Sequence, residues 1–555
     1  MTALLVAIVT SLVVIAAATV VGPRLGIASP LVLVAIGVGA SLLPMLGPVA
    51  IEPEWVLQGI LPPLLYSSAV SMPAMNFRRE FGAISGLSVL LVVGTSLVLG
   101  LFFLLAMPDL GFAWGVALGA IVSPTDAVAT SILKGTSVSR RVIAMLDGES
   151  LLNDATALVL LRTAIVAAAA GFSFWGAVGS FAYSVAVAVA LGVAVGAANL
   201  AVRRRVGDPT VNTILSFTVP FLASVPAEAL GASGLVAAVV AGIVTGTRAP
   251  RELSPQNRLS DTQNWRTVEL VLQGAVFLTM GLQMRSIVTS VEEDHAGVWS
   301  AVLVAAGALL ITVLVRAAYV APLLAVLARR GRRRERLRPR VEGLHERMAS
   351  PEGRREKIES MSGRRRPSQR ELDRISVRLR RWLADMEYFV REPLGWRDGA
   401  VVVWAGMRGA VTVAAAQTLP EDTPQRSVLV LIAFAVAGLS LLLQGGTIGP
   451  LLLRISPDID EEARAAAADA EQLRVYELLR TSAEAVAAPV EGPEARGRSA
   501  FEAARPRRLA VIAAQRSALL DARDDGTFDA EVLASVLAAL DATEIGIELR
   551  ARAQG

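Results

Sequence analysis

Runs of apolar residues long enough to cross a hydrocarbon layer of about 30 Å as a helix recur through most of this sequence. Inside hydrocarbon every main-chain N–H and C=O group needs a partner within the protein, so only helices and closed barrels span a membrane. Runs of about 20 residues suit helices, because barrel strands need only about 10. We predict an all-α polytopic membrane protein with roughly thirteen transmembrane helices. The expected spans are 3–21, 26–46, 54–72, 82–106, 110–133, 140–169, 174–202, 210–226, 230–247, 266–288, 298–328, 399–418 and 427–453.

The composition narrows the chemistry that this chain can carry out. Hydrophobic residues make up 54% of it, and it contains no cysteine and only two histidines, His295 and His345. Without cysteine there are no disulfides or thiolate metal sites, and two distant histidines argue against a histidine metal centre. We therefore expect no cofactor. The first span has no basic residue before Leu4 and no break before Ala18, so we interpret it as an uncleaved helix rather than a signal peptide.

The charges of the expected connections predict the orientation of the chain. Connections rich in Arg or Lys alternate along the sequence with connections that are acidic or uncharged. Because cytoplasmic connections carry the excess of Lys and Arg, the alternation predicts an N-terminus outside and a C-terminus in the cytoplasm. We expect a multi-pass protein of the cell membrane.

Two polar segments interrupt the membrane pattern. Residues 329–398 hold 22 Lys or Arg and 12 Asp or Glu, a net charge of +10. This loop is either simply solvated or binds anionic membrane lipid, at about 1 kcal/mol per basic residue. Nucleic acid is not an expected partner, because cytoplasmic loops of membrane proteins are normally basic. The expected parts are a transmembrane domain over 1–328, the basic loop 329–398, the last two transmembrane helices over 399–453 and a cytoplasmic helical tail over 454–555.

Helical periodicity continues in these polar segments. Apolar spacing predicts an amphipathic helix over 367–391. The tail predicts three more helices, over 459–487, 499–523 and 529–550, with Asp529 as the cap of the last. Regulation and assembly are equally compatible with such a tail.

Ser123-Pro124-Thr125-Asp126 brings a helix breaker and a carboxylate together inside the fifth span. Pro124 removes a main-chain donor and clashes with the preceding turn, while the neighbouring hydroxyls can satisfy the freed carbonyls. One interpretation is a structural kink. The other is an ion site, because transporters expose carbonyls and helix ends to ions at broken helices. Asp126 favours the ion site.

Residues 147–154, Asp-Gly-Glu-Ser-Leu-Leu-Asn-Asp, lie in one of the most apolar stretches of the chain. One charged side chain at the bilayer centre costs roughly 2.5–3.5 kcal/mol on insertion scales, so several together indicate function. On a helix, Glu149 lies beside Asn153, and Ser150 beside Asp154, which gives two adjacent polar stripes. A carboxylate here can hold a proton or a dehydrated cation, which is the requirement for exchanging one for the other.

Two arginines, Arg316 and Arg408, also fall within expected spans. A buried guanidinium must be paired, and Glu149 is the natural partner for Arg316, which leaves Asp154 to exchange ions. Glu269 is a second candidate partner for either arginine. A structural ion pair is the favoured role of both arginines over direct contact with an ion.

Several motifs follow one another within residues 1–453. They are Leu61-Pro62-Pro63-Leu64-Leu65, Ser123-Pro124-Thr125-Asp126, Gly148-Glu149-Ser150-Leu151-Leu152-Asn153-Asp154, Phe277-Leu278-Thr279-Met280-Gly281-Leu282, Gly406-Met407-Arg408-Gly409-Ala410 and Gln444-Gly445. With these motifs in this order, residues 1–453 resemble the sodium/proton antiporters of the NhaP/NHE type. The resemblance implies a homodimer of thirteen-helix protomers with inverted repeats, in which the fifth and twelfth helices are unwound and cross.

The resemblance also implies an ion site. Asp154 would be the exchanging carboxylate, and Thr125, Asp126 and Ser150 would complete a site for Na⁺, or alternatively for K⁺ or Li⁺. These ions and the proton would be substrates rather than cofactors.

The remaining implications concern the surroundings of the ion site. A Glu149–Arg316 ion pair would hold the core, and Asn153, in place of a second aspartate, resembles the electroneutral branch that exchanges one cation for one proton. Many prokaryotic relatives carry a glutamate just after the aromatic residue that follows the Leu-Pro-Pro-Leu-Leu motif. Here Tyr66 is followed by Ser67 and Ser68. Their hydroxyls can still coordinate a cation, so Ser67, like Asn153, is expected among the ion-site residues. The lost negative charge is expected to affect affinity and selectivity rather than exchange itself.

The leading hypothesis is therefore a secondary active antiporter that works by alternating access and is not an enzyme. An intramembrane aspartyl protease would use Asp126 and Asp154 as a catalytic dyad, but neither lies in a Gly-x-Gly-Asp context. A cation channel would need a continuous polar pore and a carbonyl-rich filter, which these scattered polar residues do not provide.

Overall fold

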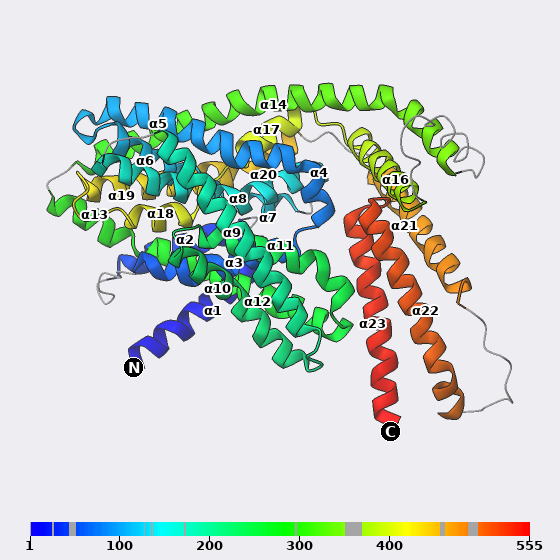
Figure 1. Cartoon of the computed structure of the whole chain (residues 1–555). Helices are drawn as coiled ribbons and strands as arrows, with labels where there is room; N and C mark the ends of the chain where they lie inside the picture. The colour runs from blue at the N-terminus through cyan, green and yellow to red at the C-terminus, as the bar shows by residue number, and fades with distance from the viewer. Residues whose placement is uncertain are drawn as a thin grey trace. The chain divides into compact units, whose positions relative to one another are not determined.

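The computed structural model describes residues 2–24, 27–43, 52–126, 128–134, 136, 138–170, 174–294, 297–349, 369–455, 461–486 and 498–554. No strand occurs within these ranges (Figure 1). Within the described residues each predicted span coincides with one or more helices, and eight helical stretches of this part of the chain are long and apolar enough to cross a membrane. The all-α membrane class is thus confirmed, and the count of thirteen crossings stays a prediction.

The chain forms two compact units. Unit 1 comprises Met1–Leu253, Ser260–Leu323 and Trp396–Pro457, and unit 2 comprises Ser254–Leu259, Leu324–Gly395 and Asp458–Gly555. Helix α14 (Val298–Ala349) runs without interruption from one to the other, so the expected boundary at residue 328 lies inside a helix. The basic loop 329–398 is described only over 329–349 and 369–398, as the end of α14, helix α16 and the start of α17.

Unit 1 is built from apolar helices. Its earlier elements are α1 (Thr2–Arg24), α2 (Ser29–Ser41), η1 (Trp55–Ile60), α3 (Leu61–Ser71), α4 (Ala74–Ser85), η2 (Gly86–Leu91), α5 (Val92–Ala106), η3 (Pro108–Leu110), α6 (Phe112–Val122), α7 (Val128–Leu133), α8 (Arg140–Ala170), α9 (Phe174–Arg203), α10 (Pro209–Ala229) and α11 (Gly234–Glu252). Its later elements are α12 (Pro255–Leu282) beyond the first turn, α13 (Met284–Glu293), the first half of α14, α17 (Trp396–Trp404), α18 (Ala410–Gln417), α19 (Arg426–Ser440), η4 (Leu441–Gly445) and α20 (Gly446–Ile455).

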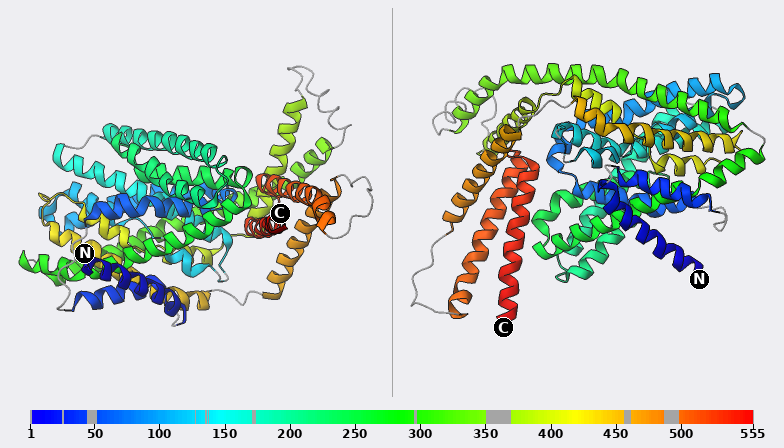
Figure 2. Two further views of the ribbon diagram at one scale, coloured as in Figure 1. Left: turned by 90° about the horizontal axis from the view of Figure 1, so that it is seen from below. Right: turned by 180° about the vertical axis from the view of Figure 1, so that it is seen from behind.

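Small residues let these helices approach closely. Helix α9 packs against α11, and α5 against α6, side by side in the views of Figures 1 and 2. On α9, a Cβ at Gly192 would lie 2.6 Å from the carbonyl oxygen of Ala237 on α11, and one at Gly196 would lie 3.0 Å from that of Ala241. Membrane helices lack a hydrophobic driving force between them, so such close contacts supply much of their packing energy.

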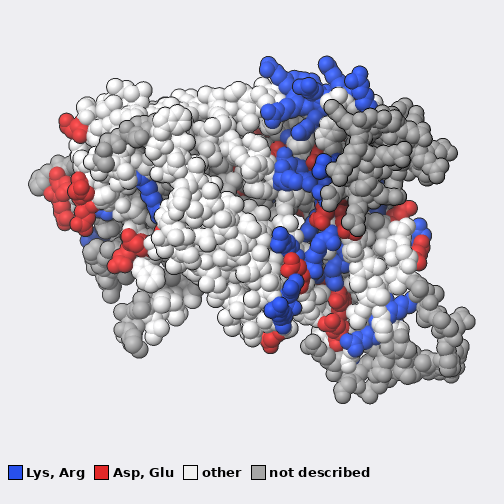
Figure 3. All heavy atoms as spheres, viewed as in Figure 1, with Lys and Arg blue, Asp and Glu red and all other residues white. Residues whose placement is uncertain are grey.

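The surface of unit 1 is largely uncharged, and polar residues lie at its helix ends, as expected for a membrane protein. In the view of Figure 3, most of its surface carries no charged side chain. Where the chain turns, polar residues cap the helices: Asp208 Oδ1 accepts the N–H groups of Thr210 and Val211 at 2.8 and 3.0 Å, just before α10. Pro209 stands at the first helical position, where its lack of an N–H leaves one donor fewer to be satisfied.

Unit 2 is also built from helices. The expected helix over 367–391 corresponds to α16 (Gln369–Arg391), and the three tail helices correspond to α21 (Glu461–Glu484), α22 (Arg498–Asp525) and α23 (Ala530–Gln554). Asp529 caps α23 as predicted, since its Oδ1 accepts the N–H of Glu531 at 2.9 Å. The core of the tail consists of Val475, Leu479, Leu519, Leu533 and Val536.

Candidate ion site

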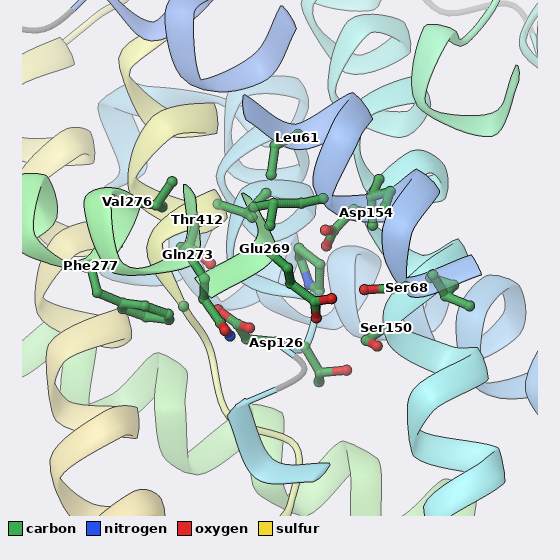
Figure 4. A pocket seen from close by; sticks show the side chains of 17 residues that line it. Leu61, Ser68, Asp126, Ser150, Asp154, Glu269, Gln273, Val276, Phe277 and Thr412 are labelled. Atoms are coloured by element: carbon green, nitrogen blue, oxygen red, sulfur yellow. The ribbon is translucent and has the colours of Figure 1, made fainter. Parts of the chain in front are cut away.

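A pocket in unit 1 collects most of the polar residues that the sequence singles out. Its cavity volume is about 90 Å³, which leaves room for a monovalent cation with a few water molecules. Its polar lining consists of Ser68, Thr125, Asp126, Ser150, Asp154, Glu269, Gln273 and Thr412. Figure 4 shows these side chains coming from α3, α8, α12, α18 and the segment after α6. None of the lining residues is a Lys, Arg or His.

The pocket is built where two helices are interrupted. Helix α6 ends at Val122 and α7 begins at Val128, on either side of Pro124. Helix α17 ends at Trp404, and α18 begins only at Ala410. The two interruptions meet, because the Asp126 N–H donates to the Met407 carbonyl oxygen at 2.7 Å.

Asp126 is held by the main chain around it. Its Oδ1 accepts the N–H of Val128 at 3.3 Å, at the start of α7. Gly409 lies directly against its carboxylate, so closely that a Cβ at this position would overlap Oδ2. Only glycine therefore fits at position 409. The start of α7 is also the positive end of that helix's dipole, which favours the negative charge of Asp126.

Glu149 and Arg316 form a buried bidentate ion pair. Arg316 Nη1 donates to Glu149 Oε1 at 2.5 Å and Nη2 to Oε2 at 2.8 Å, and the two side chains are 2% and 1% exposed. Arg316 Nε donates to the carbonyl oxygen of Val402 at 2.9 Å, just before α17 ends. Neither residue lines the pocket, so this pair neutralises itself beside the site.

Asn153 and Thr125 connect this pair to the interrupted helix. Thr125 Oγ1 donates to Glu149 Oε1 at 2.9 Å. Asn153 Nδ2 donates to the carbonyl oxygen of Thr125 at 2.8 Å and to its Oγ1 at 2.9 Å. Asn153 is fully buried and outside the pocket lining, so it positions Thr125 and lies behind the pocket wall.

Arg408 differs from its expected role as a member of an ion pair. Its side chain, 1% exposed, donates to the carbonyl oxygens of Val122 (3.2 Å) and Gly406, while its main-chain N–H donates to Ser440 Oγ at 2.9 Å. Carbonyls freed by the two helix interruptions thus solvate the guanidinium. The physical reason is that an interrupted helix offers free main-chain acceptors to a buried guanidinium.

Glu269 corrects a second expectation. It does not pair with an arginine: its Oε2 accepts a hydrogen bond of 3.0 Å from Ser67 Oγ, and it lines the pocket. Ser67 itself is buried and does not line the pocket, whereas the next residue, Ser68, does. No motif marks Gln273 or Thr412 as lining residues, and only the charge of Glu269 inside an apolar span signals its importance.

Asp154 and Ser150 face the pocket from α8. Ser150 Oγ donates to the carbonyl oxygen of Asp147 at 3.0 Å within its own helix, which leaves its lone pairs toward the pocket. Asp154 is 8% exposed, and no described residue donates a hydrogen bond to its carboxylate or forms an ion pair with it. Carboxylate and hydroxyl oxygens are the ligands that hard cations prefer, so the arrangement suits a cation or a proton.

Comparison with known proteins gives consistent matches. A family model described as "Sodium/hydrogen exchanger, transmembrane" matches residues 8–363 and 372–454. An uncharacterised Na⁺/H⁺ exchanger of Mycobacterium tuberculosis is 27% identical over 458 residues, which cover 81% of this chain and 74% of that protein. The sodium, potassium, lithium and rubidium/H⁺ antiporter of Bacillus subtilis is 29% identical over 276 residues, 48% of this chain and 41% of that one. The solved structure of the sodium proton antiporter MjNhaP1 from Methanocaldococcus jannaschii shares the fold, with a TM-score of 0.55 and 14% identity over 82% of this chain and 100% of that one.

Proposed function

This chain belongs to the transmembrane sodium/hydrogen exchanger family, and on that premise we propose that it exchanges Na⁺, or alternatively K⁺ or Li⁺, for H⁺ with Asp154 as the exchanging carboxylate. It is a multi-pass membrane cation/proton antiporter and not an enzyme. Asp126, Thr125 and Ser150 complete the proposed ion site. The protease alternative is set aside, and the transported ions are substrates, so no cofactor is needed.

One observation carries the proposal. Asp154 is a buried carboxylate that faces a pocket and receives neither a hydrogen bond nor an ion pair from any described residue. An ionised carboxylate in that position is costly unless something neutralises it. A proton and a monovalent cation are the two candidates, and each excludes the other.

The proposed cycle follows from this exclusion. Asp154 binds a cation on one side of the membrane, the helices that carry the site move, and a proton replaces the cation on the other side. Glu149 takes no direct part in the exchange, because Arg316 holds it as scaffold. Asn153 adds no charge, so we propose one cation per proton and electroneutral exchange.

Further parts of the proposal rest on the sequence. The alternating charges of the connections support an N-terminus outside the cell membrane and a cytoplasmic C-terminus. The family resemblance supports a homodimer. The basic segment 329–398 supports association with anionic lipid.

Reconstitution in liposomes tests the exchange. Wild-type protein is expected to change internal pH when Na⁺, K⁺ or Li⁺ is added, whereas Asp154→Asn is expected to give the signal of empty liposomes. Asp109→Asn, the same substitution at an exposed position outside the pocket, serves as the matched control and is expected to behave as wild type. Exchange by Asp154→Asn at the wild-type rate would overturn the mechanism. A channel would instead show unitary currents in single-channel recording.

A further inference from the structure

Glu269 is a half-buried carboxylate on α12 that lines the same pocket as Asp126 and Asp154. Its one hydrogen bond comes from Ser67 on α3, at 3.0 Å. No described Lys or Arg forms an ion pair with it. Figure 4 shows its carboxylate pointing into the space that Asp154 and Ser68 also face.

A purely structural role does not account for this placement. A single hydroxyl donor does not compensate an ionised carboxylate in a membrane span. The buried guanidinium groups are engaged elsewhere, since Arg316 binds Glu149 and Arg408 binds main-chain carbonyls. Arg266, one turn earlier on α12, is exposed and forms no ion pair with Glu269. The described residues therefore leave the contents of the pocket as the source of positive charge for Glu269.

The α3 wall of the pocket strengthens the argument. Two α3 hydroxyls lie on this side: that of Ser68, which lines the pocket, and that of Ser67, which lies behind the lining and donates to Glu269. A hydroxyl coordinates a cation through its oxygen but adds no charge. The negative charge at this side of the pocket therefore comes from α12.

We propose that Glu269, oriented by Ser67, is a cation ligand of the exchange site that sets its affinity and selectivity, while Asp154 carries out the exchange. This inference rests on the proposed function of the pocket. Glu269 is not required for turnover, because Asp154 alone exchanges proton for cation. A carboxylate is a strong-field ligand, so Glu269 favours the smaller ions, Li⁺ and Na⁺, over K⁺.

The test separates charge from shape. Glu269→Gln removes the charge and keeps an oxygen that accepts the hydrogen bond from Ser67. We expect the apparent KM for Na⁺ and Li⁺ in proteoliposomes to rise about tenfold, the KM for K⁺ to rise less, and the maximal rate to stay within a few fold. Glu292→Gln, the same change at an exposed position on α13, is the matched control and is expected to keep the wild-type KM.

A charge relocation guards against a merely structural effect. Because Ser67 Oγ and Glu269 Oε2 are 3.0 Å apart, the double variant Ser67→Glu with Glu269→Gln returns a carboxylate to the same region from α3. It is expected to restore the low KM for Na⁺, which a role of Glu269 in packing alone would not allow. An unchanged KM in Glu269→Gln, or a double variant no better than the single one, would overturn the inference. The proposed function fails separately, if Asp154→Asn still exchanges.

Discussion

Replacing Arg316 by methionine tests whether Glu149 and Arg316 act as a scaffold. Methionine keeps much of the side-chain volume but removes the two hydrogen bonds to Glu149 and the one to the Val402 carbonyl oxygen. Glu149, 1% exposed, is then left with Thr125 as its donor. Removing one partner of a buried ion pair costs about 3–5 kcal/mol, because the other charge stays buried and unpaired. Arg316→Met should therefore lower the free energy of unfolding by about 3–5 kcal/mol.

A double variant identifies the cause of the loss. Glu149→Gln combined with Arg316→Met removes both charges, so most of the lost stability should return, as it does when a buried pair is replaced as a whole. Lys134→Met is the control, since Lys134 pairs with Asp147 at 3.2 Å but its side chain is 59% exposed, and it should cost at most about 1 kcal/mol.

Stability is measured by SDS-induced and thermal unfolding of purified protein in detergent. Exchange is followed in parallel, because loss of the scaffold should also displace Thr125 and lower the rate. If Arg316→Met is as stable as wild type, or if the double variant is no more stable than the single one, the reasoning from buried charge is refuted.

Two further predictions concern the site itself. Gly409→Ala should strongly reduce exchange in liposomes, because its Cβ would overlap the Asp126 carboxylate. Its thermal stability should fall by less than that of Arg316→Met. Exchange at the wild-type rate would refute this prediction. Wild-type Na⁺/H⁺ exchange should not respond to an imposed membrane potential of either sign, because a cycle that moves one net charge gains or loses about 2.3 kcal/mol per 100 mV. A rate that changes with the sign of the potential would exclude one-to-one stoichiometry.

Most of the fold could be predicted from the sequence, because hydrocarbon leaves few choices. A span must be a helix, so apolar runs located the helices, and the sequence Ser123-Pro124-Thr125 located the interruption between α6 and α7. The boundary at residue 328 could not be placed, since α14 continues as a polar helix beyond its apolar part. A hydropathy change marks the end of a span but not the end of a helix.

The site was most predictable where buried charges of opposite sign had to meet. Glu149 was the natural partner for Arg316, with Glu269 as the alternative, and the structure pairs Arg316 with Glu149 across 167 positions of sequence. The partner of Glu269 was not fixed by charge in this way, because its hydrogen bond comes from a neutral serine. Its contact with Ser67 depends on how α3 and α12 pack, and no periodicity within either helix encodes that packing.

The carboxylates in and beside the pocket differ in the groups that contact them, and this difference indicates the role of each. Glu149 has a guanidinium, and Asp126 has the N–H of Val128 at the start of α7. Asp154 has no described partner, and Glu269 has one serine. A carboxylate paired with a fixed positive charge, as Glu149 is, gains little from a cation, whereas a carboxylate without such a partner, as Asp154 is, gains most. Cation and proton should therefore compete chiefly at Asp154, with Glu269 tuning which cation wins.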